Sequence, residues 1–435
     1  MGCSRDESAG GIAHELTRRV PSPSPAVTPP PGQPRFAGLD ALRAFAIVAV
    51  VFCHSVGIDG TWTKTSWGWI AYYAQAGVSV FLVLSGFLIY RPFAAAHADR
   101  EHGPALTRYA RRRVLRIVPA YWVALTVLAL WPGVHGVFTG DWWKYYFFLQ
   151  NYWRASQFEG LGGIMWSLGA EVAFYLLLPL LALLAARLAS RWRPERWWHG
   201  ELVVIGAFGL VSPLLVFTVE PLSAEITGGY LFPGFLASGL PGVTDWFAAG
   251  MGLAVLSVAA ARHDGQALRA TEAIGRHAPW LWGLAFVAWL VYARAEWVLG
   301  VHLWTPFLTH LAEGLAAVCV VAPVVFVAAG APIGRLTRWR PLALLGLISY
   351  GIYLWHVPLL YWLAGSDETL AAGPDLLEHP WPGLTLFVGT MALSVAVAIV
   401  SYRVVELPFL RRKEGPVRPA SRTEAGETPR TADGV

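Results

Sequence analysis

The feature that most constrains this chain is the recurrence of long apolar segments along almost its whole length. Each is long enough to cross about 30 Å of hydrocarbon at about 1.5 Å per residue. The segments lie at approximately 37–57, 70–90, 117–133, 166–186, 200–219, 243–261, 278–299, 305–329, 341–364 and 382–405. Only 14% of the residues are charged, where a soluble domain carries roughly 25%. The sequence therefore predicts an all-α polytopic membrane protein with about ten transmembrane helices in one bundle.

Polar sequence flanks the apolar region on both sides. Residues 1–35 are rich in proline, and residues 411–435 are mostly polar. Such compositions bury too little apolar surface to become ordered. We therefore expect two disordered tails around a transmembrane domain at 36–410. The N-terminal tail is not expected to be a signal peptide, because it has no apolar h-region before a small-residue cleavage site.

Lysine and arginine are segregated between alternate loops. Of the 33 Lys and Arg residues, 27 fall in the two tails and the even-numbered loops, whereas the loops at 220–242 and 365–381 contain acidic residues but no Lys or Arg. Under the positive-inside rule this distribution places both termini in the cytoplasm, with the helices in the plasma membrane. The net charge of +5 follows from the same distribution and does not indicate a partner nucleic acid.

Cysteine and histidine spacing argues against a structural metal. Three cysteines do not make a disulfide framework, and no Cys or His pair has the spacing of a closed zinc site. We therefore expect no metal and no resident cofactor.

The first apolar segment carries ionisable side chains at membrane depth, where they are costly and mark candidate functional sites. Arg43 and His54 are eleven residues apart, so at about 100° per residue they share one face of a helix, roughly 16 Å apart along its axis. In a structural alternative, Arg43 pairs with Asp40 at i, i+3 and His54 bonds to a neighbouring helix. Spacing alone leaves both interpretations open.

Two other segments contain polar side chains of interest. Glu171 begins the fourth segment, and a carboxylate there could orient an imidazole or hold its cation, or simply be satisfied near the helix start. His356 shares a face of the ninth segment with Tyr353 and Ser349. This face could bind an acceptor or form hydrogen bonds between helices.

A further pair lies in the eighth segment. His310 and Glu313 are spaced i, i+3. We expect them to form a buried structural pair, because a metal would need more ligands.

A dense cationic patch, RYARRRVLRIVPAYW, precedes the third segment. The planar arginine fork suits phosphate, so the patch could hold a phosphorylated cosubstrate, with Arg113 and Arg116 as the best candidates. Positive-inside topology and anionic lipid could also account for these charges. No Walker-type or dinucleotide glycine motif accompanies them.

Taken together, these motifs resemble the acyltransferase type 3 family of integral membrane O-acyltransferases, over essentially all of 36–410. The signatures are LDALRAFAIVAVVFCHS, GVSVFLVLSGFLI, RVLRIVPAYW, WSLGAEVAFYLLLP, ISYGIYLWHVPLL and VELPF, in that order. The resemblance implies a ten-helix fold, an acyl-coenzyme A donor that approaches from the cytoplasm, and transfer of its acyl group to a hydroxyl.

The resemblance also implies roles for individual residues. It makes His54 the catalytic residue, Arg43 its essential partner, Arg113 and Arg116 the donor-binding cations, and Glu171 an active-site carboxylate. The sequence departs from the family in reading GAEVAFY, where many members have a second acid or Gln after the Glu, so Glu171 is expected to act alone. About 25 polar residues follow the last segment, too few for the SGNH-type hydrolase domain that some relatives carry.

We therefore expect a membrane acyltransferase that moves a short acyl group from acyl-CoA to a hydroxyl of a cell-surface glycan or another sugar-containing acceptor. The acyl group is expected to be acetyl. His54 would either deprotonate that hydroxyl or carry the acyl group itself, with Glu171 orienting the ring. Two alternatives remain open. The acceptor could be a macrolide or another secondary metabolite, or the chain could be a proton-coupled transporter.

Overall fold

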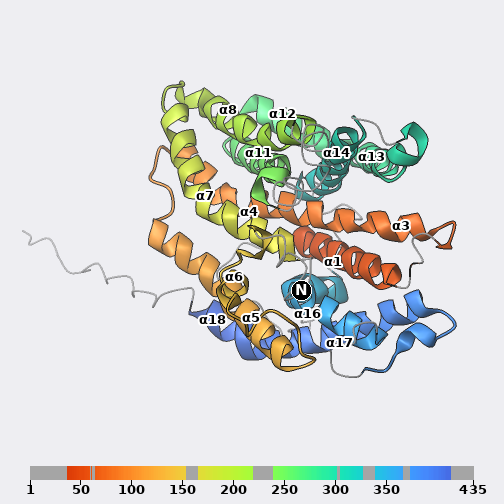
Figure 1. The fold of residues 1–435 in the computed structure, drawn as a ribbon. Helices are drawn as coiled ribbons and strands as arrows, with labels where there is room; N and C mark the ends of the chain where they lie inside the picture. The colour runs from red at the N-terminus through yellow and green to blue at the C-terminus, as the bar shows by residue number, and fades with distance from the viewer. Residues whose placement is uncertain are drawn as a thin grey trace, which may run out of the picture.

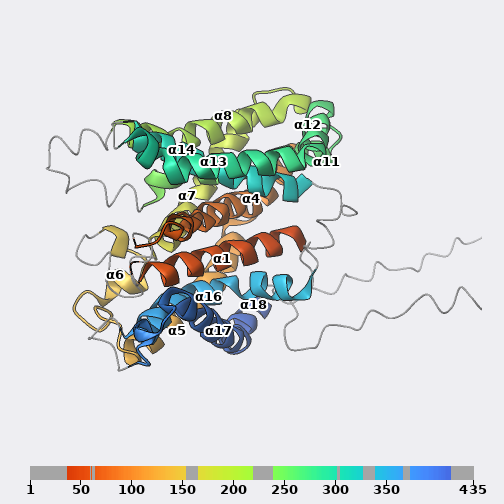
Figure 2. The same cartoon turned by 90° about the vertical axis from the view of Figure 1, so that its right-hand side faces the viewer.

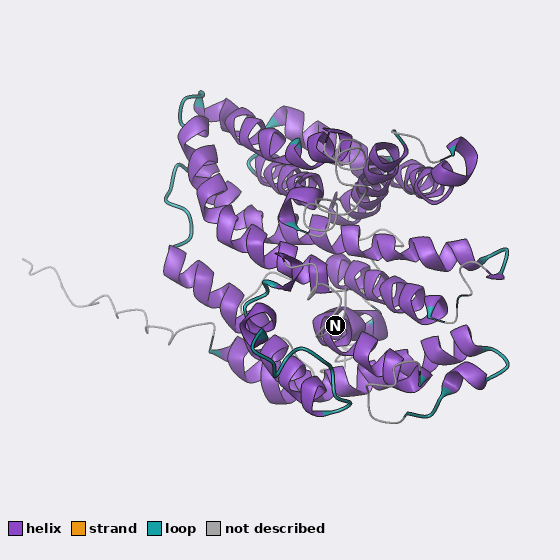
Figure 3. Cartoon of the chain, in the orientation of Figure 1, coloured by secondary structure: helices purple, strands orange, loops and turns teal. Residues whose placement is uncertain are grey.

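The computed structural model describes residues 37–58, 60, 64–152, 165–218, 239–300, 304–326, 339–365 and 373–412. Across these ranges the chain forms helices joined by turns and no strand (Figure 3). The prediction of an all-α protein is therefore confirmed. The two expected tails lie outside the described residues, apart from the last turn at 411 and 412.

The helices follow one another along the chain as labelled in Figure 1. They are α1 (Ala37–Gly57), α3 (Gly68–Tyr73), α4 (Gly77–Ala98), α5 (Leu106–Leu130), α6 (Trp142–Tyr146), α7 (Trp166–Ala189), α8 (Trp197–Gly209), α11 (Thr244–Ala261), α12 (Gly265–Arg276), α13 (Ala278–Leu299), α14 (Thr305–Phe326), α16 (Arg340–Ala364), α17 (Pro382–Ser401) and α18 (Leu407–Arg411). A π-helical turn, η8 (Tyr402–Glu406), joins the last two.

Nine stretches of the described chain are long and apolar enough to cross a membrane. They correspond to nine of the ten expected segments, so the chain is a multi-pass membrane protein. The remaining segment forms α13, which has 22 residues. Its sequence contains two charged residues, Arg294 and Glu296, and four tryptophans.

Helices α1 and α4 lie at the centre of the bundle. Figures 1 and 2 show them between one group of helices, α8, α11, α13 and α14, and a second group, α5, α16, α17 and α18. The most extensive pairings join α4 to α11, α13 to α14, α1 to α16 and α16 to α17. The face of α1 that carries Arg43 and His54 is therefore enclosed by other helices instead of facing lipid along its whole length.

Glycine allows the central helices to approach very closely. A Cβ atom on Gly346 of α16 would lie 1.9 Å from the carbonyl oxygen of Asp40 in α1, and one on Gly250 of α11 would lie 2.0 Å from the carbonyl oxygen of Val83 in α4. Small residues at such crossings permit backbone contact, which is a principal source of packing energy between membrane helices. The sequence therefore sets the spacing of α1 against α16 and of α4 against α11.

Two helices begin or extend beyond the expected segments. Helix α5 begins at Leu106, eleven residues before the expected boundary at 117, so the arginine patch is helical and not a loop. Arginine is a good helix former, and a helix that leaves the hydrocarbon can present its guanidinium groups at the headgroup level. Helix α12 was not predicted. It is short and amphipathic, and the side chain of Asp264 caps its N-terminus by accepting from the backbone N–H groups of Gln266 and Ala267.

Candidate active site

The first helix places a cation and an imidazole on one enclosed face, as the spacing predicts. Arg43 Nη1 lies 3.6 Å from Asp40 Oδ1, so the predicted i, i+3 pairing is present. Arg43 also lies close enough to Arg116 and Glu171 for their charges to interact. Arg43 therefore interacts with Arg116 and Glu171 as well as with Asp40.

His54 contacts a second imidazole that comes from a distant part of the sequence. Its Nδ1 lies 3.3 Å from Nε2 of His356, and the two ring centroids are 5.3 Å apart. The contact follows from the close packing of α1 on α16. His356 is completely buried, and its Nδ1 lies 2.8 Å from the carbonyl oxygen of Tyr353 and 3.2 Å from that of Ile352.

Glu171 is held by helix α4 and by its own helix, α7. Its Oε1 accepts hydrogen bonds from the hydroxyls of Ser85 and Tyr175. Glu171 is predicted to orient His54, but the described side-chain hydrogen bond of the His54 ring joins it to His356. No local pattern signals the contact between Ser85 and Glu171, because 86 residues separate them.

The two predicted donor-binding cations lie on one face of α5 and have different surroundings. Arg113 lies between two aromatic rings, 6.0 Å from the centroid of Tyr109 and 5.7 Å from that of Tyr175. Its Nε is buried and has no hydrogen-bond partner. Arg116 lies close enough to Arg43 for the two guanidinium charges to interact. A buried guanidinium N–H without a partner is the kind of group that donates a hydrogen bond to a phosphate or carboxylate oxygen.

One residue of this region was not singled out by the sequence. Glu406, in the VELPF signature, is 6% exposed and lies in the π-helical turn η8. Its Oε1 has no hydrogen-bond partner, and its charge interacts with that of Arg116. Single π turns inside helices are frequent at functional sites. Glu406 thus places a further carboxylate close to Arg116.

The other two polar residues on the ninth segment make separate contacts. The hydroxyl of Tyr353 lies 2.9 Å from Ser167 Oγ of α7, and Ser349 Oγ donates to the carbonyl oxygen of Gly346 in its own helix at 2.9 Å. Among the described hydrogen bonds of these three residues, the one to His54 comes from His356.

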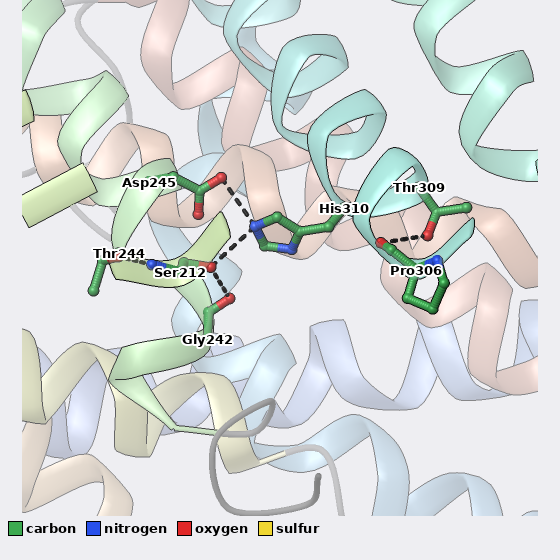
Figure 4. Close-up of polar contacts among 7 residues, drawn as sticks. All are labelled: Ser212, Gly242, Thr244, Asp245, Pro306, Thr309 and His310. Atoms are coloured by element: carbon green, nitrogen blue, oxygen red, sulfur yellow. Dashed lines mark hydrogen bonds and ion pairs between the residues drawn. The ribbon is translucent and has the colours of Figure 1, made fainter. Parts of the chain in front are cut away.

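A second polar cluster contains the residue types of a Ser-His-Asp triad (Figure 4). His310 Nε2 lies 3.0 Å from Asp245 Oδ2 and 3.0 Å from Ser212 Oγ. Ser212 Oγ donates to the carbonyl oxygen of Gly242 at 2.6 Å. A catalytic triad uses opposite nitrogens of the imidazole, one toward the nucleophile and one toward the carboxylate. Here both oxygens face the same nitrogen, which must carry its proton, so the ring provides no base for Ser212.

This cluster adds a partner from another helix to the predicted pair in the eighth segment. His310 lies close enough to Glu313 for their charges to interact, and its Nε2 also forms a hydrogen bond with Asp245 of α11. Trp246 stacks on the His310 ring with 5.1 Å between centroids. The cluster therefore joins α11 and α14. Within the described residues, no group of three or more His, Cys, Asp and Glu side chains could hold a metal ion.

Comparison with curated proteins gives relatives along most of the chain. The chain is 25% identical over 396 residues to peptidoglycan O-acetyltransferase OatA of Listeria monocytogenes. The alignment covers 87% of this chain and 56% of that relative. It is 23% identical over 411 residues to O-acetyltransferase OatA of Staphylococcus aureus, covering 88% and 58%. It is 26% identical over 401 residues to nodulation protein 10 of Rhizobium leguminosarum, covering 86% and 92%.

The chain thus spans little more than half the length of the two O-acetyltransferases. No solved structure matches it significantly. The acyltransferase 3 family, described as an acyltransferase domain, matches residues 36–403. This match includes every predicted site residue on α1, α5, α7 and α16. The chain therefore belongs to the acyltransferase 3 family.

Proposed function

We propose that this chain transfers an acetyl or other short acyl group from acyl-coenzyme A to a hydroxyl of a cell-surface glycan, in the plasma membrane and with both termini in the cytoplasm. The observation that carries the proposal is the alignment of 87% of the chain with a peptidoglycan O-acetyltransferase. The enclosed polar groups of α1, α5, α7 and α16 supply side chains for each half of such a reaction.

The donor half of the reaction is assigned to α5. Arg113 and Arg116 would bind the phosphate groups of coenzyme A, since guanidinium groups bind phosphate oxygens with two parallel hydrogen bonds. The buried and unused Nε of Arg113 supports this assignment. Arg43, which shares a charged neighbourhood with Arg116, would stabilise negative charge that develops on the thioester oxygen.

The acceptor half is assigned to His54. In one route, His54 removes the proton of the acceptor hydroxyl as the oxygen attacks the thioester carbonyl, and the departing thiolate then takes that proton. In the other route, His54 attacks the carbonyl first and transfers the acyl group to the hydroxyl in a second step. Both routes end with an ester and free coenzyme A thiol. Glu171, fixed by Ser85 and Tyr175, would offset the positive charge of Arg43.

The test is thiol release by the purified full chain in detergent, with acetyl-CoA as donor and a soluble peptidoglycan fragment as acceptor. We expect His54→Ala to reduce the rate by at least about 100-fold, the usual lower range for loss of a general acid or base. The exposed His102 provides a matched control, and His102→Ala should leave the rate unchanged. Turnover that survives His54→Ala would refute the assignment of His54.

The same assay separates the alternatives. Thiol release with a macrolide but not with the glycan fragment would change the class of acceptor and keep the transfer reaction. Substrate counterflow in proteoliposomes without any thiol release would favour a transporter and would overturn the proposed function.

A further inference from the structure

We propose that His356 is a positioning residue that fixes the tautomer of His54, so that the proton of the neutral His54 ring lies on Nδ1 and the lone pair lies on Nε2. This inference rests on the proposed role of His54 in acyl transfer. It follows from whether each ring nitrogen donates or accepts a hydrogen bond, beginning with the buried ring of His356 and then turning to His54.

The buried ring, His356, has only one possible arrangement of its proton. Its Nδ1 lies 2.8 Å from the carbonyl oxygen of Tyr353 and 3.2 Å from that of Ile352. Carbonyl oxygens only accept hydrogen bonds, so Nδ1 must be the N–H donor. A neutral imidazole has a single N–H. The other nitrogen, Nε2, therefore presents a lone pair.

The neutral form of His356 is the form that its surroundings favour. The side chain is 0% exposed, and its hydrogen-bond partners are two backbone carbonyls and another imidazole. A second proton would place a buried charge in this position without a carboxylate partner, which is strongly unfavourable. His356 therefore acts as an acceptor toward α1.

His54 must match this acceptor with a donor. Its Nδ1 lies 3.3 Å from His356 Nε2, and two facing lone pairs would repel each other, so the proton of His54 lies on Nδ1. The backbone carbonyl of Val50, one helical turn earlier, also bonds to His54. In His356 and His277, the nitrogen that faces the carbonyl four residues earlier is Nδ1. If Val50 is contacted in the same way, this second acceptor also favours a proton on Nδ1 of His54.

This arrangement has a direct chemical consequence. A general base or a nucleophile needs a lone pair, and the lone pair of His54 is confined to Nε2, the nitrogen farther from its own backbone. When Nε2 takes a proton or an acyl group, the ring becomes a cation whose Nδ1–H still donates to His356. A buried neutral acceptor thus performs the orienting role that a carboxylate performs in a catalytic triad. It does so without placing a carboxylate beside His54.

The test compares two substitutions of His356 in the purified full chain. The amide oxygen of His356→Gln can occupy the position of Nε2 and accept from His54, whereas the ring of His356→Phe fills similar volume without an acceptor. We expect kcat to fall by about 100-fold in His356→Phe, while KM for acetyl-CoA changes by less than about threefold. In His356→Gln, kcat should be at least about tenfold higher than in His356→Phe. In a catalytic triad, the wrong tautomer lowers kcat by about 10⁴-fold.

A control and a direct readout complete the experiment. Trp355, also buried on α16, controls for general disturbance of the helix, and Trp355→Phe should keep kcat within about threefold. The tautomer is read from ¹⁵N-histidine spectra of the wild-type protein, with the His54 signals assigned by their loss in His54→Gln. We expect protonated Nδ1 and unprotonated Nε2.

Equal kcat values for His356→Phe and wild type, or a proton on Nε2 of His54, would overturn the inference. If His356→Phe does not fold, the spectrum and the Gln variant still decide the question. Absence of thiol release by the wild-type protein would defeat the proposed function instead, while the spectrum would continue to test the tautomer.

Discussion

The contact between α4 and α11 leaves no space for a methyl group, and this makes Gly250→Ala a demanding test of the fold. A Cβ atom at Gly250 would lie 2.0 Å from the carbonyl oxygen of Val83 and 2.7 Å from the backbone nitrogen of Phe87. Ordinary van der Waals contact begins at 3.4 Å, so the two backbones must separate locally by 3.4 − 2.0, or about 1.4 Å. Both obstacles are backbone atoms, which cannot move aside by changing a rotamer.

We expect Gly250→Ala to lower the free energy of unfolding by about 1–3 kcal/mol, the usual cost of overpacking a well-packed interior. A free energy of 1.4 kcal/mol already changes the folded-to-unfolded ratio about tenfold. The displacement also affects the candidate active site, because Ser85, which donates to Glu171, lies on α4 between the two obstructing residues. Acyl transfer should therefore fall together with stability.

Gly252, two residues further along α11, provides the matched control. A Cβ atom there has no neighbour within 4 Å. Gly252→Ala should be neutral or stabilise the helix by up to about 1 kcal/mol, since glycine is an unfavourable residue in a helix interior. The measurement is reversible unfolding in mixed micelles. Equal stabilities for Gly250→Ala and Gly252→Ala would show that the two helices are not in backbone contact and would refute the reasoning.

Three further predictions concern polar groups outside the candidate active site. Ser212→Ala should leave thiol release unchanged, because His310 cannot act as its base, and should cost about 1 kcal/mol of stability for the lost hydrogen bond; an inactive but folded variant would contradict this. Glu201 is completely buried and accepts from Tyr90 and His97, so Glu201→Gln should lower the free energy of unfolding by about 1.5–3 kcal/mol, as measured by unfolding in mixed micelles. Asp99 accepts two hydrogen bonds from Arg262, and these lower the pKa of Asp99. The stability that this pair contributes is present at neutral pH and is lost as the pH falls through that lowered pKa, so the melting temperatures of Asp99→Asn and wild type should differ at pH 7 and approach each other as the solution is acidified.

Segment composition was sufficient to predict most of the fold. The first expected segment, 37–57, has the same limits as α1, because an uninterrupted apolar run determines both where a helix enters the hydrocarbon and where it leaves it. Boundaries were less accurate where a helix continues past the hydrocarbon. The arginine run before 117 suggested a loop, but helical hydrogen bonding continues through α5 as far back as Leu106.

The candidate site was predicted only in part. Spacing placed Arg43 and His54 on one face, because both lie on one helix and a helix has a fixed period. The partners of His54 and Glu171 were not predicted. His356 is 302 residues from His54, and Ser85 is 86 residues from Glu171. No local pattern encodes contacts of this kind.

The sequence by itself determined that the chain crosses a membrane many times and which few ionisable groups enter the hydrocarbon, since the cost of removing charges and backbone groups from water acts on each segment separately. Only the tertiary structure decided which of these groups meet. Close approach of α1 to α16 at Gly346, and of α4 to α11 at Gly250, sets the distances between their side chains. The tautomer proposed for His54 therefore depends on His356, which helix packing brings next to it.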